Sequence, residues 1–167
     1  MNGKLTINGG TIEGMDGISL RSGTLEITGG TIIGNAPTNT IDEDGYWDND
    51  FAACTGNAVQ VISRQNSNPQ YQNPTVKING GHFISENADP IASYAGYKGE
   101  TPDVAASGFV YGGTFNKQIA AELCAPGYIC TQNADGTYGI VDDPVNEYID
   151  NIAELIAFCD AVNNGNS

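Results

Sequence analysis

One short pattern occurs four times in this chain and limits the folds that it can adopt. LTINGGTIEG at 5–14 returns as LEITGGTIIG at 25–34, as VKINGGHFIS at 76–85 and in outline as GFVYGGTFNK at 108–117. Alignment on the glycine pairs gives three apolar columns: Leu5, Leu25 and Val76, with Gly108 as the exception; Ile7, Ile27, Ile78 and Val110; and Ile12, Ile32, Phe83 and Phe115. The apolar residues before each glycine pair are two apart, which is the period of a β-strand and not of a helix.

The spacing of these units predicts a β-solenoid. The Gly-Gly pair lets the backbone turn a sharp corner, because glycine accepts positive φ. A third short strand follows in GISLRSG at 17–23, where Ile18 and Leu20 are again two apart. Coils stacked about 4.8 Å apart would pair each strand with its copy above and below. The leucine-rich pattern LxxLxLxxN and the calcium-binding pattern GGxGxD fit the sequence less well.

The (L/V)x(I/V)xGGx(I/F) units resemble those of right-handed parallel β-helix repeat proteins, the pectin-lyase-like superfamily. They are also similar to repeats in large surface proteins of gut Firmicutes, in which I-x-GG-T-F recurs. Residues 112–141 are similar to the ending that such modules share: GGTF, a short helix, a Gly-Tyr and a DGTY hairpin. The resemblance covers most of the chain and is specific for the fold. It says little of function, because the superfamily includes lyases, hydrolases and inert adhesin stalks.

We therefore expect an all-β fold, a short right-handed parallel β-helix of about four coils over residues 1–117. The long polar stretches between the repeats predict three inserted loops, at 35–57, 64–74 and 95–107. The second of these is broken by prolines, as loops commonly are.

Residues 118–141 are expected to form a C-terminal cap, made of a short helix and a hairpin that turns at Asp135-Gly136. Such a cap covers strand edges that would otherwise invite aggregation. Residues 142–167 predict an amphipathic helix that leads towards a further module. Its apolar residues follow spacings of three and four: Val145, Tyr148, Ile149, Ile152, Leu155, Ile156, Cys159 and Val162. Docking on the solenoid and binding to a partner both remain open for this helix.

The net charge of the chain argues against two classes of binding partner. With 20 acidic and 6 basic residues, a net charge of -14, the chain lacks the basic stripe that nucleic-acid binding needs. Anionic lipid headgroups are disfavoured for the same reason. The longest apolar runs fall short of the ~20 residues that cross a bilayer, so we expect no membrane insertion. A signal peptide is not present in MNGKLTI, but the resemblance implies an extracellular or bacterial cell-surface location.

Four cysteines are present: Cys54, Cys124, Cys130 and Cys159. Their spacing matches neither a CxxC pair nor a zinc site. Cys124 and Cys130 are close enough to bridge across CAPGYIC, so both a disulfide and free thiols are open interpretations.

The most unusual stretch is IDEDGYWDND at 41–50. Its carboxylates predict a calcium site, although they miss the spacing of the EF-hand loop; the ligands would be Asp42, Asp44, Asp48 and Asp50. A ligand site for a glycan would use the rings of Tyr46 and Trp47 with Asp44 and Asp48, because flat rings stack on sugars. A solvated acidic loop that packs on the solenoid through Trp47 and Phe51 is the other interpretation. Further aromatic residues lie in or beside the loops: Tyr71, Tyr94, Tyr97 and Tyr111.

Enzymes of the superfamily carry their reactive groups on the outward face of one sheet. Here the expected outward positions are Thr6, Asn8, Glu26, Thr28, Lys77, Asn79, Phe109 and Tyr111. Glu26 with Lys77 one coil away predicts a surface ion pair, which contributes about 0–1 kcal/mol. His82, the single histidine, is expected to be a solvated corner residue. No catalytic residue is predicted, and no cofactor other than calcium.

We therefore expect a non-catalytic, adhesin-like surface module whose loops contact a polysaccharide, another glycan or a host protein, beside neighbouring modules of a longer chain. Two alternatives remain: a carbohydrate-active fragment, lyase or glycoside hydrolase, that uses Asp42, Asp44 or Asp48, and a structural spacer.

Overall fold

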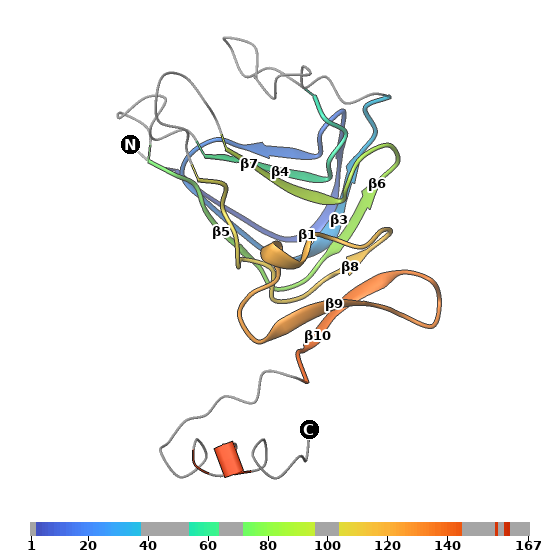
Figure 1. The fold of residues 1–167 in the computed structure, drawn as a ribbon. Coiled ribbons are helices and arrows are strands. Elements are labelled where there is room, and N and C mark those ends of the chain that lie inside the picture. The colour runs from blue at the N-terminus through green and yellow to red at the C-terminus, as the bar shows by residue number, and fades with distance from the viewer. Residues whose placement is uncertain are drawn as a thin grey trace.

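The computed structural model describes residues 3–37, 54–63, 72–95 and 104–144, together with Ile156, Cys159 and Asp160. Within these ranges the fold is all-β, as expected. A large sheet has the order β1-β3-β6-β8-β10-β9, with β5 also beside β3, and a small sheet has the order β2-β4-β7 (Figure 1). The strands of the large sheet are β1 (Lys4–Gly14), β3 (Thr24–Gly34), β5 (Thr75–Ile78), β6 (His82–Ser85), β8 (Thr114–Phe115), β9 (Tyr128–Gln132) and β10 (Tyr138–Asp142). Those of the small sheet are β2 (Ile18–Leu20), β4 (Val59–Ser63) and β7 (Ile91–Ala95).

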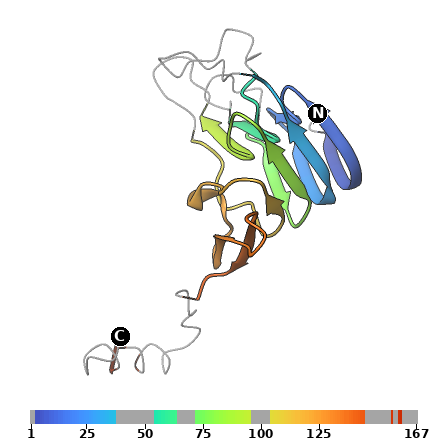
Figure 2. The ribbon, with the colours of Figure 1, turned by 90° about the vertical axis from the view of Figure 1, so that its right-hand side faces the viewer.

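Repeated segments pair in parallel and in register, which confirms the alignment on the glycine pairs. Strand β3 pairs with β1 on one side and with β5 and β6 on the other. The partners are the aligned residues: Leu5↔Leu25↔Val76, Ile7↔Ile27↔Ile78 and Ile12↔Ile32↔Phe83↔Phe115. Isolated bridges extend the second of these columns from Ile78 to Val110 and then to Cys124. Figure 2 shows these strands side by side along the stack.

The strands of the small sheet, on the opposite side of the core, also pair in parallel and in register. Ile18 of β2 pairs with Val59 of β4, which pairs with Ile91 of β7. The neighbouring inward column runs from Leu20 through Val61 to Ser93, so its last member is polar. Each of the first three turns therefore contributes to both sheets, and the apolar side chains meet between them.

The columns form the hydrophobic core. Ile27, Ile78 and Val110 are fully buried, as are Phe83 and Phe115, whose rings stack with centroids 5.2 Å apart. Each buried aliphatic or aromatic side chain of this size stabilises the fold by about 1.5–3 kcal/mol relative to exposure. A slip of one residue in the strand pairing would turn these inward side chains towards solvent.

The two glycines of each pair have different structural roles. The second one has positive φ: 84° at Gly10, 95° at Gly30 and 114° at Gly81. The first one allows close stacking, since a Cβ at Gly29 would lie only 2.7 Å from the carbonyl oxygen of Asn8 in the preceding turn. The sequence predicted the sharp turn at each glycine pair, but it did not predict that the first glycine is needed for close backbone stacking.

The segment expected to form the cap contains the predicted hairpin and a shorter helical element than expected. Residues Ala121–Leu123 form a single 3-10 turn, η1. Strands β9 and β10 form an antiparallel hairpin, and β10 pairs with β8, so that the hairpin ends the large sheet. Gly136 in its turn has a φ of 86°, and the carboxylate of Asp135 accepts hydrogen bonds from the backbone N–H and the hydroxyl of Thr137.

Other expectations fall partly or wholly beyond the described ranges. The centres of the three expected loops, at 38–53, 64–71 and 96–103, lie outside the described residues. Of the expected C-terminal helix, Ile156, Cys159 and Asp160 have helical conformation. Ile156 is 56% exposed, and Cys159 is exposed too; these two members of the expected apolar stripe are therefore not buried against the described strands.

The stacking role of the first glycine can be tested with a matched pair of variants. We expect Gly29→Ala to lower the free energy of unfolding by about 1–3 kcal/mol, because the new methyl group meets backbone that cannot move aside. Gly9→Ala, at the equivalent position of the outermost strand, meets no atom within 4 Å. It should change stability by less than about 0.5 kcal/mol. Guanidinium unfolding measures both, and equal effects would contradict the stacking role.

Candidate functional site

The outward face of the large sheet carries an ion pair near the N-terminal end. Glu26 lies opposite Lys77 in the parallel register, as expected. The ion pair is nevertheless made with Lys4, whose Nζ lies 2.9 Å from a Glu26 carboxylate oxygen. The hydrogen bond and the charge of Lys4 hold the pKa of Glu26 below its usual value, and Lys77 adds a smaller effect. Because the pair is exposed, its contribution to stability is small.

Lys77 contacts an aromatic pair instead. Its ammonium lies 5.1 Å from the centroid of the Tyr111 ring. The ring of Tyr128, from the cap, meets Tyr111 edge to face, with centroids 5.9 Å apart and an angle of 70°. Tyr111 is 39% exposed, whereas Tyr128 packs against the core cluster. We call these three residues the Tyr111 platform: one exposed ring, fixed from below by a second ring and flanked by a cation.

Two points about this face were not predicted correctly. Phe109 was expected to point outward with Tyr111, but it is only 4% exposed. Its backbone N–H bonds to the carbonyl of Leu123 in η1, so the cap covers this part of the strand. Tyr128 was missed because its role depends on the cap folding back beside the repeat, which the strand periodicity does not encode.

Hydrogen bonds fix both ends of the first expected loop, and a partly buried polar network forms one of these ends. The carboxylate of Asp16 accepts bonds from the backbone N–H groups of Thr55, at 2.9 Å, and Gly56, at 2.7 Å, and from the Thr55 hydroxyl. The side-chain amide of Gln60 donates to Thr55, at 2.7 Å. At the other end, the backbone N–H of Asn35 bonds to the carbonyl of Gly14, at 3.0 Å. Residues 35–37 and 54–57 are thus anchored to the neighbouring strands and turns.

The same network reaches β7. The side-chain amide of Asn57 donates to the carbonyl of Asp89, at 2.7 Å, and the hydroxyl of Tyr94 donates to the Asn57 side-chain oxygen, at 3.2 Å. Burial is the main cause of the raised pKa of Tyr94. Tyr94 was one of the aromatic residues considered for sugar stacking, but its hydroxyl is used inside this network.

The residues of the expected acidic site lie outside the described residues: Asp42, Asp44, Tyr46, Trp47, Asp48 and Asp50. The calcium site and the glycan site at this loop therefore stay predictions. Within the described ranges, no group of three or more His, Cys, Asp or Glu side chains is placed to hold a metal ion. No helix in those ranges is long and apolar enough to cross a membrane.

His82 lies on β6 between Thr31 and Thr114, in the register that the aligned repeats predicted. It is half-buried and not fully solvated. The bonds from Thr137 are the main cause of the lowered pKa of Asp135, and the positive charge of His82 adds a small effect. The histidine thus lies close to the turn of the cap hairpin.

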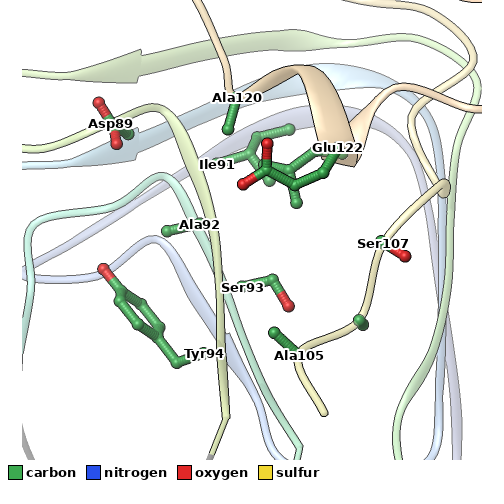
Figure 3. A pocket seen from close by; sticks show the side chains of 11 residues that line it. Asp89, Ile91, Ala92, Ser93, Tyr94, Ala105, Ser107, Ala120 and Glu122 are labelled. Carbon is green, nitrogen blue, oxygen red and sulfur yellow. The ribbon is translucent and has the colours of Figure 1, made fainter. Parts of the chain in front are cut away.

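A pocket of about 220 Å³ lies beside β7. Figure 3 shows Ala92, Ser93 and Tyr94 of β7 on one side of it, and Ala105 and Ser107 on the other. Ile91 and Leu123 add apolar surface, and Asp89 and Glu122 bring carboxylates to its wall. The hydroxyl of Ser93 is buried and has no hydrogen-bond partner in the part of the chain that the structure describes.

Cys124 and Cys130 are both free thiols in the structure, so the disulfide across CAPGYIC is not formed there. Cys124 is the last member of the inward column that begins at Ile7, and it is 8% exposed. Cys130 lies on β9 opposite Ile140 and packs against the same core cluster. Burial, and then the neighbouring Cys130, raise the pKa of the Cys124 thiol.

Comparison with known proteins gives no match to a family model, a curated protein or a solved structure. The resemblance to β-helix repeat proteins is therefore argued from the repeats alone.

The environment of Cys124 predicts its reactivity. Iodoacetamide attacks the thiolate, so burial and a raised pKa should both slow the reaction. In the native protein at pH 8 we expect Cys124 to be alkylated at least about tenfold more slowly than the exposed Cys159. Peptide mapping by mass spectrometry measures both rates, and unfolding in guanidinium should make them similar. Equal rates in the native protein would contradict the placement of Cys124 in the core.

Proposed function

We propose that the chain is a right-handed parallel β-helix module of an extracellular or bacterial cell-surface protein, that it displays a contact surface for glycans, and that it catalyses no reaction. Parallel, in-register pairing of segments that follow one another in the sequence supports the helix. Connections between parallel strands of one sheet are right-handed in about 98% of cases, which supports the hand.

The observation that carries the glycan proposal is the Tyr111 platform. A tyrosine ring offers an apolar face and a polar edge, which suits the C–H face and the hydroxyl groups of a sugar. The ring of Tyr111 is exposed, and Tyr128 holds it in place, so little side-chain entropy is lost on binding. Lys77 and Glu26 follow on the same outward face, where they can bond to hydroxyl or carboxylate groups of a polymer.

The anchored ends of the first expected loop support display as the mode of action. Asp16 holds residues 54–57 with hydrogen bonds to charged oxygen, a type that contributes about 1.5–3 kcal/mol each. A loop that leaves a fixed base is presented at a defined place on the module. The Trp47 loop would then add a second contact surface, in which Tyr46, Trp47, Asp44 and Asp48 bind the glycan and calcium is held by Asp42, Asp44, Asp48 and Asp50.

One observation favours a second candidate, a carbohydrate-active enzyme. Two carboxylates, Asp89 and Glu122, line the same pocket, and glycoside hydrolysis commonly uses a carboxylate pair. This differs from the sequence-based alternative, which placed the carboxylates at Asp42, Asp44 or Asp48. The pocket lies beside β7, so this candidate does not involve the Tyr111 platform.

Binding to a panel of plant and mucosal oligosaccharides tests the proposal, with isothermal titration as the measurement. For glycans that bind, Tyr111→Ala should weaken affinity by about two- to tenfold, since one aromatic stacking contact contributes roughly 0.5–1.5 kcal/mol. Tyr111→Phe keeps the ring and should retain most of the affinity. Val141→Ala removes an exposed apolar side chain elsewhere on the cap and serves as the control.

The same panel separates the alternatives when its products are analysed by mass spectrometry. New reducing or unsaturated ends that vanish in Asp89→Asn or Glu122→Gln would overturn the non-catalytic proposal. Absence of binding by every glycan would contradict the glycan surface and leave a host-protein contact or a structural spacer.

A further inference from the structure

The two sheets of the solenoid end at different levels. In the large sheet, the strand pairing continues past β6 to β8 and β10. In the small sheet the pairing among the described residues stops at β7, the third strand. The cap covers the end of the large sheet only, through the pairing of β10 with β8. In the described part of the chain, one edge of β7 is therefore unpaired, at the position that a fourth strand of the small sheet would occupy.

The backbone at this edge has unused hydrogen-bonding groups. The N–H of Val59 in β4 bonds to the carbonyl of Pro90, at 3.0 Å. In a parallel pair, successive residues direct their backbone groups alternately to the two sides of the strand. The N–H and C=O groups of Ile91 and Ser93 therefore point away from β4. Among the described residues none bonds to these groups outside the β4 pairing.

The side chains agree with an incomplete sheet. Ser93 continues the inward column of Leu20 and Val61, but its buried hydroxyl has no partner in the described ranges. An unbonded buried hydroxyl costs about 1–3 kcal/mol, so a group that supplies its partner would bind favourably. Ile91 beside it is an apolar column residue that a further side chain could cover.

The pocket beside this edge has the size for a stretch of backbone. Its volume of about 220 Å³ is far above the roughly 10–15 Å³ that a single water molecule needs. Its walls are made largely of small side chains, which leave the edge of β7 accessible: Ala92, Ala105, Ala106, Ala120 and Ser107 (Figure 3).

The charge at the pocket favours a basic occupant. Asp89 and Glu122 lie in its wall, and the whole chain has a net charge of -14. Lys117 approaches the same corner, but its ammonium donates to the carbonyls of Glu86 and Ala88.

We propose that the open edge of β7 binds an extended, basic peptide segment of a partner protein as the fourth strand of the small sheet. Main-chain hydrogen bonds to Ile91 and Ser93 give the affinity, as in other cases of strand addition to a sheet edge. Specificity comes from an apolar residue over Ile91, a residue two positions later that bonds to the Ser93 hydroxyl, and a flanking lysine or arginine near Glu122. The site is separate from the Tyr111 platform and does not depend on glycan binding.

The probe is the peptide acetyl-KVTSTK-amide, titrated into the isotope-labelled protein and followed by NMR. We expect saturable binding, with slowed amide hydrogen exchange at Ile91 and Ser93 in the complex. The same peptide with N-methyl groups on its two threonines keeps its charge and side chains but loses the backbone donors that face the carbonyls of Ile91 and Ser93. It should bind at least about tenfold more weakly, because several hydrogen bonds are lost together.

Two protein variants give the matching control. Ser93→Pro removes the free N–H but no bond to β4, and proline is tolerated on edge strands; it should weaken binding about tenfold. Ser93→Ala removes only the hydroxyl and should weaken binding by less. Glu122→Gln should weaken binding a few-fold and reduce its salt dependence.

Several results would overturn the proposal. These are no binding at 1 mM peptide, equal binding of the N-methylated peptide, or protection at residues other than those of the pocket. Amides of Ile91 and Ser93 that are already protected in the unbound protein would show that the chain itself closes this edge, which also overturns it. A sugar that protects these amides in place of the peptide would assign the pocket to the glycan ligand and count against a peptide partner.

Discussion

The close stacking of backbone on backbone at the glycine pairs is the constraint on which the rest of this structure depends. The first glycine of a pair leaves room for the carbonyl of the turn below, 2.7 Å from where the Cβ of Gly29 would be. The second takes the positive φ that turns the chain through the corner. When both of these requirements are met, successive turns lie at the spacing of a β-ladder and the apolar columns are in register. Side-chain burial stabilises this arrangement, but the glycines decide which residue lies over which.

Much of the fold could be predicted because its determinants repeat. Ile7, Ile27, Ile78 and Val110 follow one another at the same distance from a glycine pair, and they form one buried column. The extension of that column to Cys124 was not predicted, because this residue precedes no glycine pair and joins the column only through the fold of the cap. Phe109 was wrongly predicted to point outward, because the alternation along a strand does not show that η1 folds against this segment.

The functional surfaces were less predictable, since they depend on contacts between segments that share no pattern. The outward positions of Lys77 and Tyr111 followed from the repeat, but the support from Tyr128 required the position of the cap. Among the described residues the small sheet ends one level before the large one, and the pocket beside β7 lies at that end. Ser93, a polar residue at the end of an apolar column, is the one sign of it in the sequence. The acidic loop around Trp47 lies outside the described residues and stays a prediction.

Methyl-to-methyl nuclear Overhauser effects would test the central claim, the in-register parallel stack, most directly. With labelled isoleucine, leucine and valine methyl groups, the structure predicts cross-peaks between Ile7 and Ile27, Ile27 and Ile78, and Ile78 and Val110, because these pairs are direct ladder neighbours. It also predicts cross-peaks from Ile18 to Val59 and from Val59 to Ile91 in the small sheet. Cross-peaks that join Ile27 to residues outside its column, in place of Ile7 and Ile78, would mean that the turns do not stack in this register and would contradict the account.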